Sequence, residues 1–264
     1  MSDTSKFADL KTRFLSAIVM VAVGATALWF GGWIFTLLIV AAVFAMHWEM
    51  GRMLTPLSMQ AHWFSAVTSA IALIWVLTSD SVTEQIVVII IATVLQRVYF
   101  HTVDTLGTLV SLGIMIGALL LIHMRTEIGM TATLWIIGLV VITDISGYFV
   151  GRIMGGPKFW PAFSPKKTWS GIVGGWIGAA LFTYVMVQGG HLSLLQVETA
   201  MFIALCLSFA SQLGDITESA LKRASGVKDS SYLIPGHGGV MDRFDGLIGA
   251  SLVYAAILGL MTWL

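Results

Sequence analysis

The sequence predicts an all-α integral membrane protein, a polytopic helical bundle of about nine transmembrane helices. Hydrophobic residues make up 57% of the 264 positions, charged residues make up 11%, and the mean hydropathy is +0.90. A soluble globule of this size needs more polar surface than this composition supplies. Several uncharged runs, among them Thr105–Met124 and Gly246–Leu264, reach the roughly 20 residues that a spanning helix needs. No stretch is left over for a soluble domain.

The spans can be placed in order along the chain. The run Phe14–Trp48 has no formal charge and is too long to cross a bilayer as one helix, so we expect a tight break at Gly31 and Gly32. No short apolar core with a small-residue cleavage site follows the polar amino end, so the first span is expected to remain uncleaved. The expected spans are Phe14–Phe30, Ile34–Met50, Ala61–Leu77, Val82–Tyr99, Leu106–Ile122, Thr131–Gly151, Gly171–Gln188, Val197–Ser219 and Gly246–Leu264.

The distribution of basic residues supports this count. With nine spans, 13 of the 14 Lys and Arg residues fall on one side of the membrane and only Arg125 falls on the other. Because basic residues concentrate on the cytoplasmic side, the amino end is expected in the cytoplasm and the carboxyl end outside. The same topology places the loops 152–170 and 220–245 on the cytoplasmic face. The first five spans contain no comparable cluster of charged residues, so we expect residues 1–130 to form a scaffold of five spans and residues 131–264 to carry the chemistry.

The cysteine count and the net charge exclude some structural and functional classes. Cys206 is the only cysteine and lies in an apolar run, so an intrachain disulfide is excluded. A formal net charge of zero argues against a nucleic-acid-binding surface. In the seventh span, small residues at helical spacing favour close approach by a neighbouring helix. These residues are Gly171, Gly174, Gly175 and Gly178.

The charged residues gather in one short segment. Nine of the 28 Asp, Glu, Lys and Arg residues lie between Asp215 and Asp245. Asp215, Glu218, Ser219 and Lys222 are spaced i, i+3, i+4 and i+7, so they share one face at the end of the eighth span.

Further acids lie at the start of the ninth span and within the sixth span. Asp242 and Asp245 repeat the i, i+3 spacing at the start of the ninth span. Asp144 lies within the sixth span and must face the bundle interior, because an unpaired Asp in lipid costs several kcal/mol.

These acids would repel one another unless cations neutralised them. Mg²⁺ is a hard ion that prefers oxygen ligands and binds through a few carboxylates together with substrate phosphates. We expect one or two cations, at least one of them Mg²⁺, and a monovalent ion stays open for the second. The candidate ligands are Asp144, Asp215, Glu218, Asp242 and Asp245. The alternative is that these acids form structural ion pairs with Lys222, Arg223 and Arg243.

A glycine-rich stretch precedes the last span. Its residues are Pro235, Gly236, His237, Gly238 and Gly239. Backbone N–H groups of such a stretch can approach a phosphate without obstruction by side chains, and His237 can add a donor. The alternative is that the glycines simply form turns.

Together these residues resemble the signature of the phosphatidate cytidylyltransferases, also called CDP-diacylglycerol synthases. The matching positions are Ser219, Lys222, Arg223, Lys228, Asp229, Ser231, His237, Gly238, Gly239, Asp242, Arg243 and Asp245. The resemblance extends upstream to Asp144–Arg152, Ser164–Gly171 and Ser211–Ser219. It departs at Ser170, where many members carry an acidic or amide residue.

The resemblance implies transfer of the cytidylyl group of CTP to phosphatidate, giving CDP-diacylglycerol and pyrophosphate for phospholipid biosynthesis in a bacterial inner membrane. It implies CTP, phosphatidate and membrane lipid as partners, and leaves a homodimer open. The catalytic residues it implies are Asp215, Asp242, Asp245, Lys222 and Arg223. The substrate-binding residues it implies are Lys167, Ser219, Lys228, Asp229, His237, Gly238, Gly239 and Arg243.

Two alternatives stay open at this point. Intramembrane Asp144 and Asp215 can mark a cation or proton transporter, although transporter sites usually lie near the bilayer midplane and here the charges gather at one face. The second alternative is a cytidylyltransferase that acts on another lipid phosphate.

Overall fold

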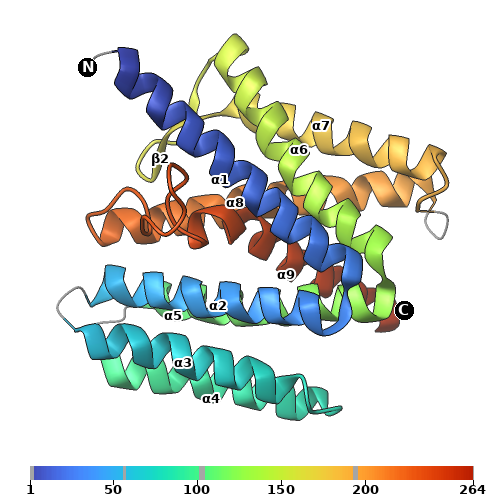
Figure 1. Ribbon diagram of the computed structural model, residues 1–264. Helices are drawn as coiled ribbons and strands as arrows, with labels where there is room; N and C mark the ends of the chain where they lie inside the picture. The colour runs from blue at the N-terminus through green and yellow to red at the C-terminus, as the bar shows by residue number, and fades with distance from the viewer. Residues whose placement is uncertain (1–2, 56–57, 101–104, 193–195, 264) are drawn as a thin grey trace. The chain divides into compact units, whose positions relative to one another are not determined.

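A computed structural model describes residues 3–55, 58–100, 105–192 and 196–263. Within these ranges the chain is almost entirely helical (Figure 1). Eight of the described helices, α1 to α8, are long and apolar enough to cross a membrane. The predicted fold class, a polytopic helical membrane protein, is therefore confirmed.

The elements follow the order predicted from hydropathy. They are α1 (Asp3–Phe30), α2 (Gly32–Leu54), α3 (Met59–Val76), α4 (Val82–Phe100), α5 (Thr105–His123), a π-helical turn η1 (Met124–Ile128), α6 (Met130–Met154), β1 (Lys158–Trp160), β2 (Ser164–Thr168), α7 (Trp169–Gln188), α8 (Val197–Ala224) and α9 (Met241–Trp263). The ninth helix is present, although the last residue of the span predicted for it, Leu264, lies outside the described residues.

The expected break between the first two spans is confirmed. Gly31 has φ of 62° and Gly32 has φ of 48°. Only glycine adopts this left-handed region at little cost, so the pair ends α1 and begins α2 within two residues.

Two compact units make up the chain. The first comprises Met1–Ile122 and Ala224–Arg243, and the second comprises His123–Arg223 and Phe244–Leu264. This division reflects packing and not chemistry, so the expected separation into a scaffold (1–130) and a catalytic region (131–264) stays a prediction.

A chain of buried polar side chains joins α2, α3, α4 and α5 in the first unit. His47 Nε2 lies 3.1 Å from Ser111 Oγ, and Ser111 Oγ donates to Gln96 Oε1 at 2.9 Å. Gln96 Nε2 in turn donates to Ser69 Oγ at 2.6 Å. Between apolar helices such bonds contribute about 1 kcal/mol each, because the alternative is an unsatisfied polar group.

In the second unit the apolar core lies among α6, α7, α8 and α9. It includes Trp135 and Leu139 of α6, Ala179 of α7, Leu207 of α8 and Tyr254 of α9. The indole N–H of Trp135 donates to Thr183 Oγ1 at 2.9 Å, so the one polar group of this buried ring is satisfied.

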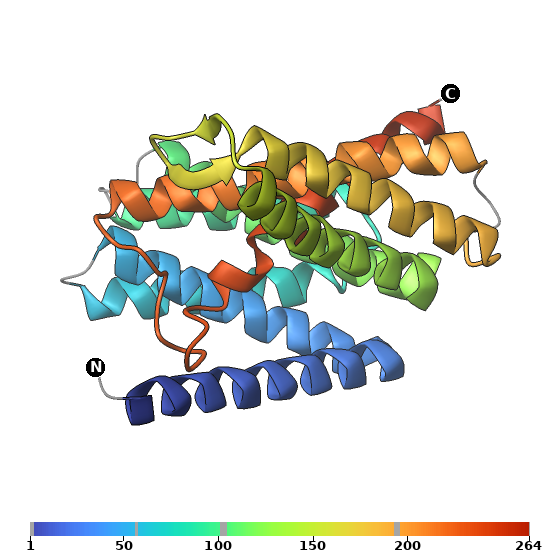
Figure 2. The same cartoon turned by 90° about the horizontal axis from the view of Figure 1, so that it is seen from above.

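Glycines bring α6 and α7 into direct backbone contact (Figure 2). A Cβ atom on Gly171 would lie 2.7 Å from the Gly147 carbonyl oxygen, and one on Gly147 would lie 2.9 Å from the Gly171 carbonyl oxygen. The predicted packing role of the glycines in the seventh span is therefore confirmed, because side chains at these positions would force the two helices apart.

The connections that flank these helices differ in detail from the expected loops. In the loop 152–170, β1 and β2 form an antiparallel hairpin that pairs Lys158 with Thr168. Thr168 then caps α7, because its Oγ1 accepts a hydrogen bond from the Gly171 N–H at 3.2 Å. The loop expected at 220–245 is shorter, since α8 continues to Ala224 and α9 begins at Met241.

We expect the substitution Gly171→Ala to destabilise the protein by about 1–3 kcal/mol, because the added methyl group meets backbone atoms that cannot rotate away. Thermal unfolding of the purified protein in detergent measures this as a lower Tm. Gly24→Ala in α1 is the matched control, since a Cβ atom there meets nothing within 4 Å. Equal melting temperatures for both variants would contradict the assigned packing role.

Candidate active site

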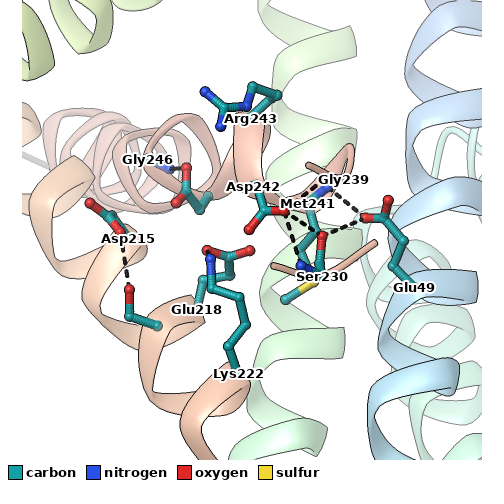
Figure 3. A network of polar contacts seen from close by, with 12 residues as sticks. Glu49, Asp215, Glu218, Lys222, Ser230, Gly239, Met241, Asp242, Arg243 and Gly246 are labelled. Carbon is teal, nitrogen blue, oxygen red and sulfur yellow. Dashed lines mark hydrogen bonds and ion pairs between the residues drawn. The ribbon is translucent and has the colours of Figure 1, made fainter. Parts of the chain in front are cut away.

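Three carboxylates converge in the second unit. Asp215 and Glu218 lie on one face of α8 (Figure 3), and Asp245 lies in the first turns of α9. One oxygen of each carboxylate lies within 4.8 Å of the others. Glycines permit this approach of α9 to α8, because a Cβ atom on Gly249 would lie 3.1 Å from the Gly214 Cα. The i, i+3 spacing thus puts Asp215 and Glu218 on the same face of α8, and the packing of α9 against α8 brings Asp245 to them.

Two lysines offset part of this negative charge. Lys167 Nζ lies 2.6 Å from Asp215 Oδ2, and Lys222 Nζ lies 2.5 Å from Glu218 Oε2. The Ser219 hydroxyl also donates to Asp215 Oδ1 at 3.3 Å. The ion-pair alternative therefore describes Glu218 and Lys222, while Asp215 is paired with a lysine from β2.

The third carboxylate, Asp245, is disfavoured in its charged form by its surroundings. Asp245 precedes the apolar run that begins at Gly246, whose N–H donates to Asp245 Oδ1 at 2.7 Å. Burial, and after it the neighbouring Asp215 carboxylate, raise the pKa of Asp245 to about 7. Asp144 adds a smaller contribution in the same direction. Three hard oxygen donors that share an incompletely compensated charge fit a divalent cation such as Mg²⁺.

A pocket of about 580 Å³ opens beside these residues within the second unit. Its charged lining combines cations with two of the predicted acids: Arg152, Lys158, Lys166, Lys167, Asp144 and Asp215. Arg152 Nη1 donates to the Tyr148 hydroxyl at 2.6 Å, and Tyr148 also lines the pocket. Cations of this number in one concave site fit the negative charge of a polyphosphate.

Glycines form much of the pocket wall. They are Gly147, Gly151, Gly155, Gly156 and Gly171. Ser170 holds one of these glycines in place, since its hydroxyl donates to the Gly155 carbonyl oxygen at 2.5 Å. Among the described residues Ser170 does not line the pocket, which gives a structural role to the position that departs from the family pattern.

Asp242 belongs to the first unit, where it organises the segment before α9. Its Oδ2 atom accepts hydrogen bonds from the Ser230 N–H at 3.0 Å, the Ser230 hydroxyl at 2.9 Å and the Gly239 N–H at 2.7 Å (Figure 3). The i, i+3 relation of Asp242 to Asp245 on α9 is as expected. Its role as a metal ligand stays a prediction.

The glycine-rich stretch is held by contacts of its own. The His237 N–H donates to the Ile234 carbonyl oxygen at 2.9 Å, and Arg243 Nε donates to the His237 carbonyl oxygen at 3.1 Å. His237 Nδ1 lies 2.8 Å from the Ser16 hydroxyl of α1. Gly238 has φ of 82°, so it makes a turn that favours glycine. Turn formation accounts for this stretch, and its role in phosphate binding stays a prediction.

The remaining predicted substrate contacts lie on the surface. Arg223 occupies the last turn of α8, and Lys228 and Asp229 follow it in the connection to α9. All three residues are exposed. Their side chains are therefore accessible to a ligand.

The site residues predicted from the sequence did not include the pocket cations Arg152, Lys158 and Lys166. They also did not include Glu49 of α2. Its buried carboxylate accepts four hydrogen bonds, from the hydroxyls of Ser230 and Ser231 and from the N–H groups of Val240 and Met241 (Figure 3). The signal that could have found it is an acid inside a predicted span, where acids are expensive and therefore rarely without function.

The apolar helices are those of an integral membrane protein, and its pocket of carboxylates, lysines and an arginine suits a phosphate-bearing ligand. Comparisons with known proteins give the family. A sequence model described as the cytidylyltransferase family matches residues 11–261. A protein of Brucella melitensis named phosphatidate cytidylyltransferase is 34% identical over 251 residues, which cover 92% of this chain and 91% of the relative. A protein of the same name from Staphylococcus epidermidis is 33% identical over 254 residues, covering 89% of this chain and 94% of the relative.

The chain belongs to the cytidylyltransferase family. The resemblance seen in the signature residues is thereby confirmed, and the protein is an enzyme of the nucleotidyltransferase class. The family match also favours an enzyme over the transporter considered from the sequence.

Proposed function

We propose that this enzyme transfers the cytidylyl group of CTP to phosphatidate, giving CDP-diacylglycerol and pyrophosphate. The family match and the name shared by its curated relatives support this reaction. The structural observation that carries it is the group of three carboxylates beside a pocket lined by lysines and arginines.

The reaction asks little of a general base. The nucleophile is an oxygen of the phosphatidate phosphate, a monoester that is already ionised near neutral pH. This oxygen attacks the α-phosphorus of CTP, a new P–O bond forms, and the bond from the α-phosphorus to the bridging oxygen breaks so that pyrophosphate leaves. Positioning and charge neutralisation can therefore supply most of the catalysis. This is consistent with a site rich in charges and glycines.

The cationic side chains are assigned to the substrate phosphates. Lys167, with Arg152, Lys158 and Lys166 beside it in the pocket, binds the triphosphate. Lys222, Arg223 and Lys228 are the further cations proposed to contact substrate phosphates.

Asp215, Glu218 and Asp245 of the second unit would hold Mg²⁺, with Asp144 as an additional ligand. Asp242 stays a ligand predicted from the signature. When bound, Mg²⁺ neutralises charge on the CTP phosphates and stabilises the leaving pyrophosphate.

The membrane arrangement follows from the two substrates. Phosphatidate keeps its tails in hydrocarbon and enters sideways, while CTP arrives from water. We place the amino end and the site on the cytoplasmic side of a bacterial inner membrane, with the carboxyl end outside, because the basic residues favour this orientation. A homodimer stays a prediction.

An omission assay tests the reaction. Purified protein in detergent, given labelled CTP, phosphatidate and Mg²⁺, is expected to produce a labelled lipid and pyrophosphate. Omission of any one component, or addition of EDTA, is expected to reduce product to background. If an ether-linked lipid phosphate serves as acceptor while phosphatidate does not, the substrate is wrong although cytidylyl transfer stands. Hydrolysis of CTP without any lipid product would contradict the proposed reaction.

Substitution of the carboxylates tests the site. We expect Asp215→Asn and Asp242→Asn each to lower kcat by at least about 100-fold, because an amide lacks the negative charge that would hold the cation needed to neutralise the phosphates. The melting temperature of each variant establishes that it is folded. Asp80→Asn, at an exposed acid before α4, is the control expected to retain parental turnover. Near-normal kcat in both folded site variants would refute their assignment.

A further inference from the structure

Glu49 is a buried carboxylate for which the proposed chemistry has no use. Its side chain is fully buried in α2. Its oxygens accept hydrogen bonds from the Ser231 hydroxyl at 2.6 Å, the Ser230 hydroxyl at 3.2 Å, and the N–H groups of Val240 and Met241 at 2.8 Å each. Three partners donate to Glu49 alone, and the Ser230 hydroxyl shares its one proton between Glu49 Oε2 and Asp242 Oδ2. A buried carboxylate requires such donors.

The donors come from both ends of the segment that carries much of the signature. Ser230 and Ser231 lie at its beginning, and Val240 and Met241 lie where α9 starts. The N–H groups at the start of a helix have no partner within the helix, and an acid placed there is favoured by the helix dipole. Glu49 thus closes the segment 230–241 into a loop and fixes the first turn of α9.

The same contacts reach Asp242. The Ser230 hydroxyl lies between the two carboxylates, 3.2 Å from Glu49 Oε2 and 2.9 Å from Asp242 Oδ2. The Gly239 N–H donates to Asp242, and a Cβ atom on Gly239 would collide with Ser230 Oγ and with the Glu49 carboxylate. The orientation of Asp242 is therefore coupled to Glu49 through Ser230 and Gly239.

We infer that Glu49 is a positioning residue for the reaction: it fixes the loop 230–241 and through it Asp242, without contacting a substrate. The inference rests on the proposed function, in which Asp242 acts during turnover. It also assigns a task in the active site to α2, which belongs to the region predicted from the sequence to be scaffold.

Three variants test the inference. Glu49→Gln keeps the size of the side chain but replaces one acceptor oxygen with a donor, and is expected to lower kcat roughly 10- to 100-fold through misplacement of the loop. The KM for CTP is expected to stay within about threefold of the parental value, since the contact is not made to substrate. Glu84→Gln is the matched control, because Glu84 is exposed and its carboxylate accepts hydrogen bonds from Ser79 and Trp75 nearby in the chain. Its kcat is expected to be parental.

The third variant, Ser230→Ala, separates positioning from general stability. Because Glu49 and Ser230 hold the same loop, the double variant is expected to lose less activity than the product of the two single losses. Parental kcat in Glu49→Gln would overturn the inference, as would strictly multiplicative effects. A loss of activity that matches the loss of folded protein, with parental kcat in the folded fraction, would also overturn it.

Hydrogen–deuterium exchange provides a readout independent of turnover. We expect faster exchange at the amides of residues 239–241 in Glu49→Gln than in the parent and in Glu84→Gln. Unchanged exchange would overturn the proposed contact. If the parent shows no CTP-dependent product, the proposed function fails, and exchange still decides whether Glu49 holds the loop.

Discussion

Repulsion among carboxylates that are gathered in one partly buried site is the constraint on which the rest of this structure depends. In the second unit, one oxygen from each of three acids lies within 4.8 Å of the others. Lys167 and Lys222 each pair with one of them, and the third, Asp245, has its pKa raised to about 7 by burial and by Asp215. Protonation of Asp245 or a bound cation would relieve the remaining repulsion. A bound divalent cation would supply positive charge and would attract the phosphates of CTP, which connects the composition of the chain to its chemistry.

The first unit meets the same constraint in a different way. Glu49 and Asp242 are satisfied by hydroxyl and backbone donors of the loop 230–241. Both oxygens of Glu49 and the Oδ2 atom of Asp242 accept hydrogen bonds from the loop, so this group of contacts holds the loop in place. The carboxylates of α8 and α9 instead lie beside an open pocket with four cationic side chains. Acids thus hold a loop in the first unit, and in the second unit they are proposed to bind a cation.

Hydropathy and local spacing predicted the parts of this protein that depend on neighbours in sequence. The spans, the break at Gly31 and the shared face of Asp215 and Glu218 on α8 are all local consequences of helix geometry. The signature pattern pointed to Asp245, but only helix packing through Gly214 and Gly249 brings it to the other two acids. The pairing of Lys167 with Asp215 and the contacts of Glu49 join residues far apart in sequence. A hydropathy profile shows that a span contains a charged residue, but it does not show which distant residue that side chain contacts. The Lys167–Asp215 pair and the contacts of Glu49 could therefore not be predicted.

The central claim, that these carboxylates form a divalent-cation site, is tested most directly by metal binding without substrate. Mn²⁺ is a paramagnetic substitute for Mg²⁺, and its binding to the purified protein can be followed by electron paramagnetic resonance. The account predicts saturable binding that Mg²⁺ displaces, that Asp245→Asn greatly weakens and that Asp80→Asn leaves unchanged. Parental binding in Asp245→Asn, or no saturable binding in the parent, would contradict it.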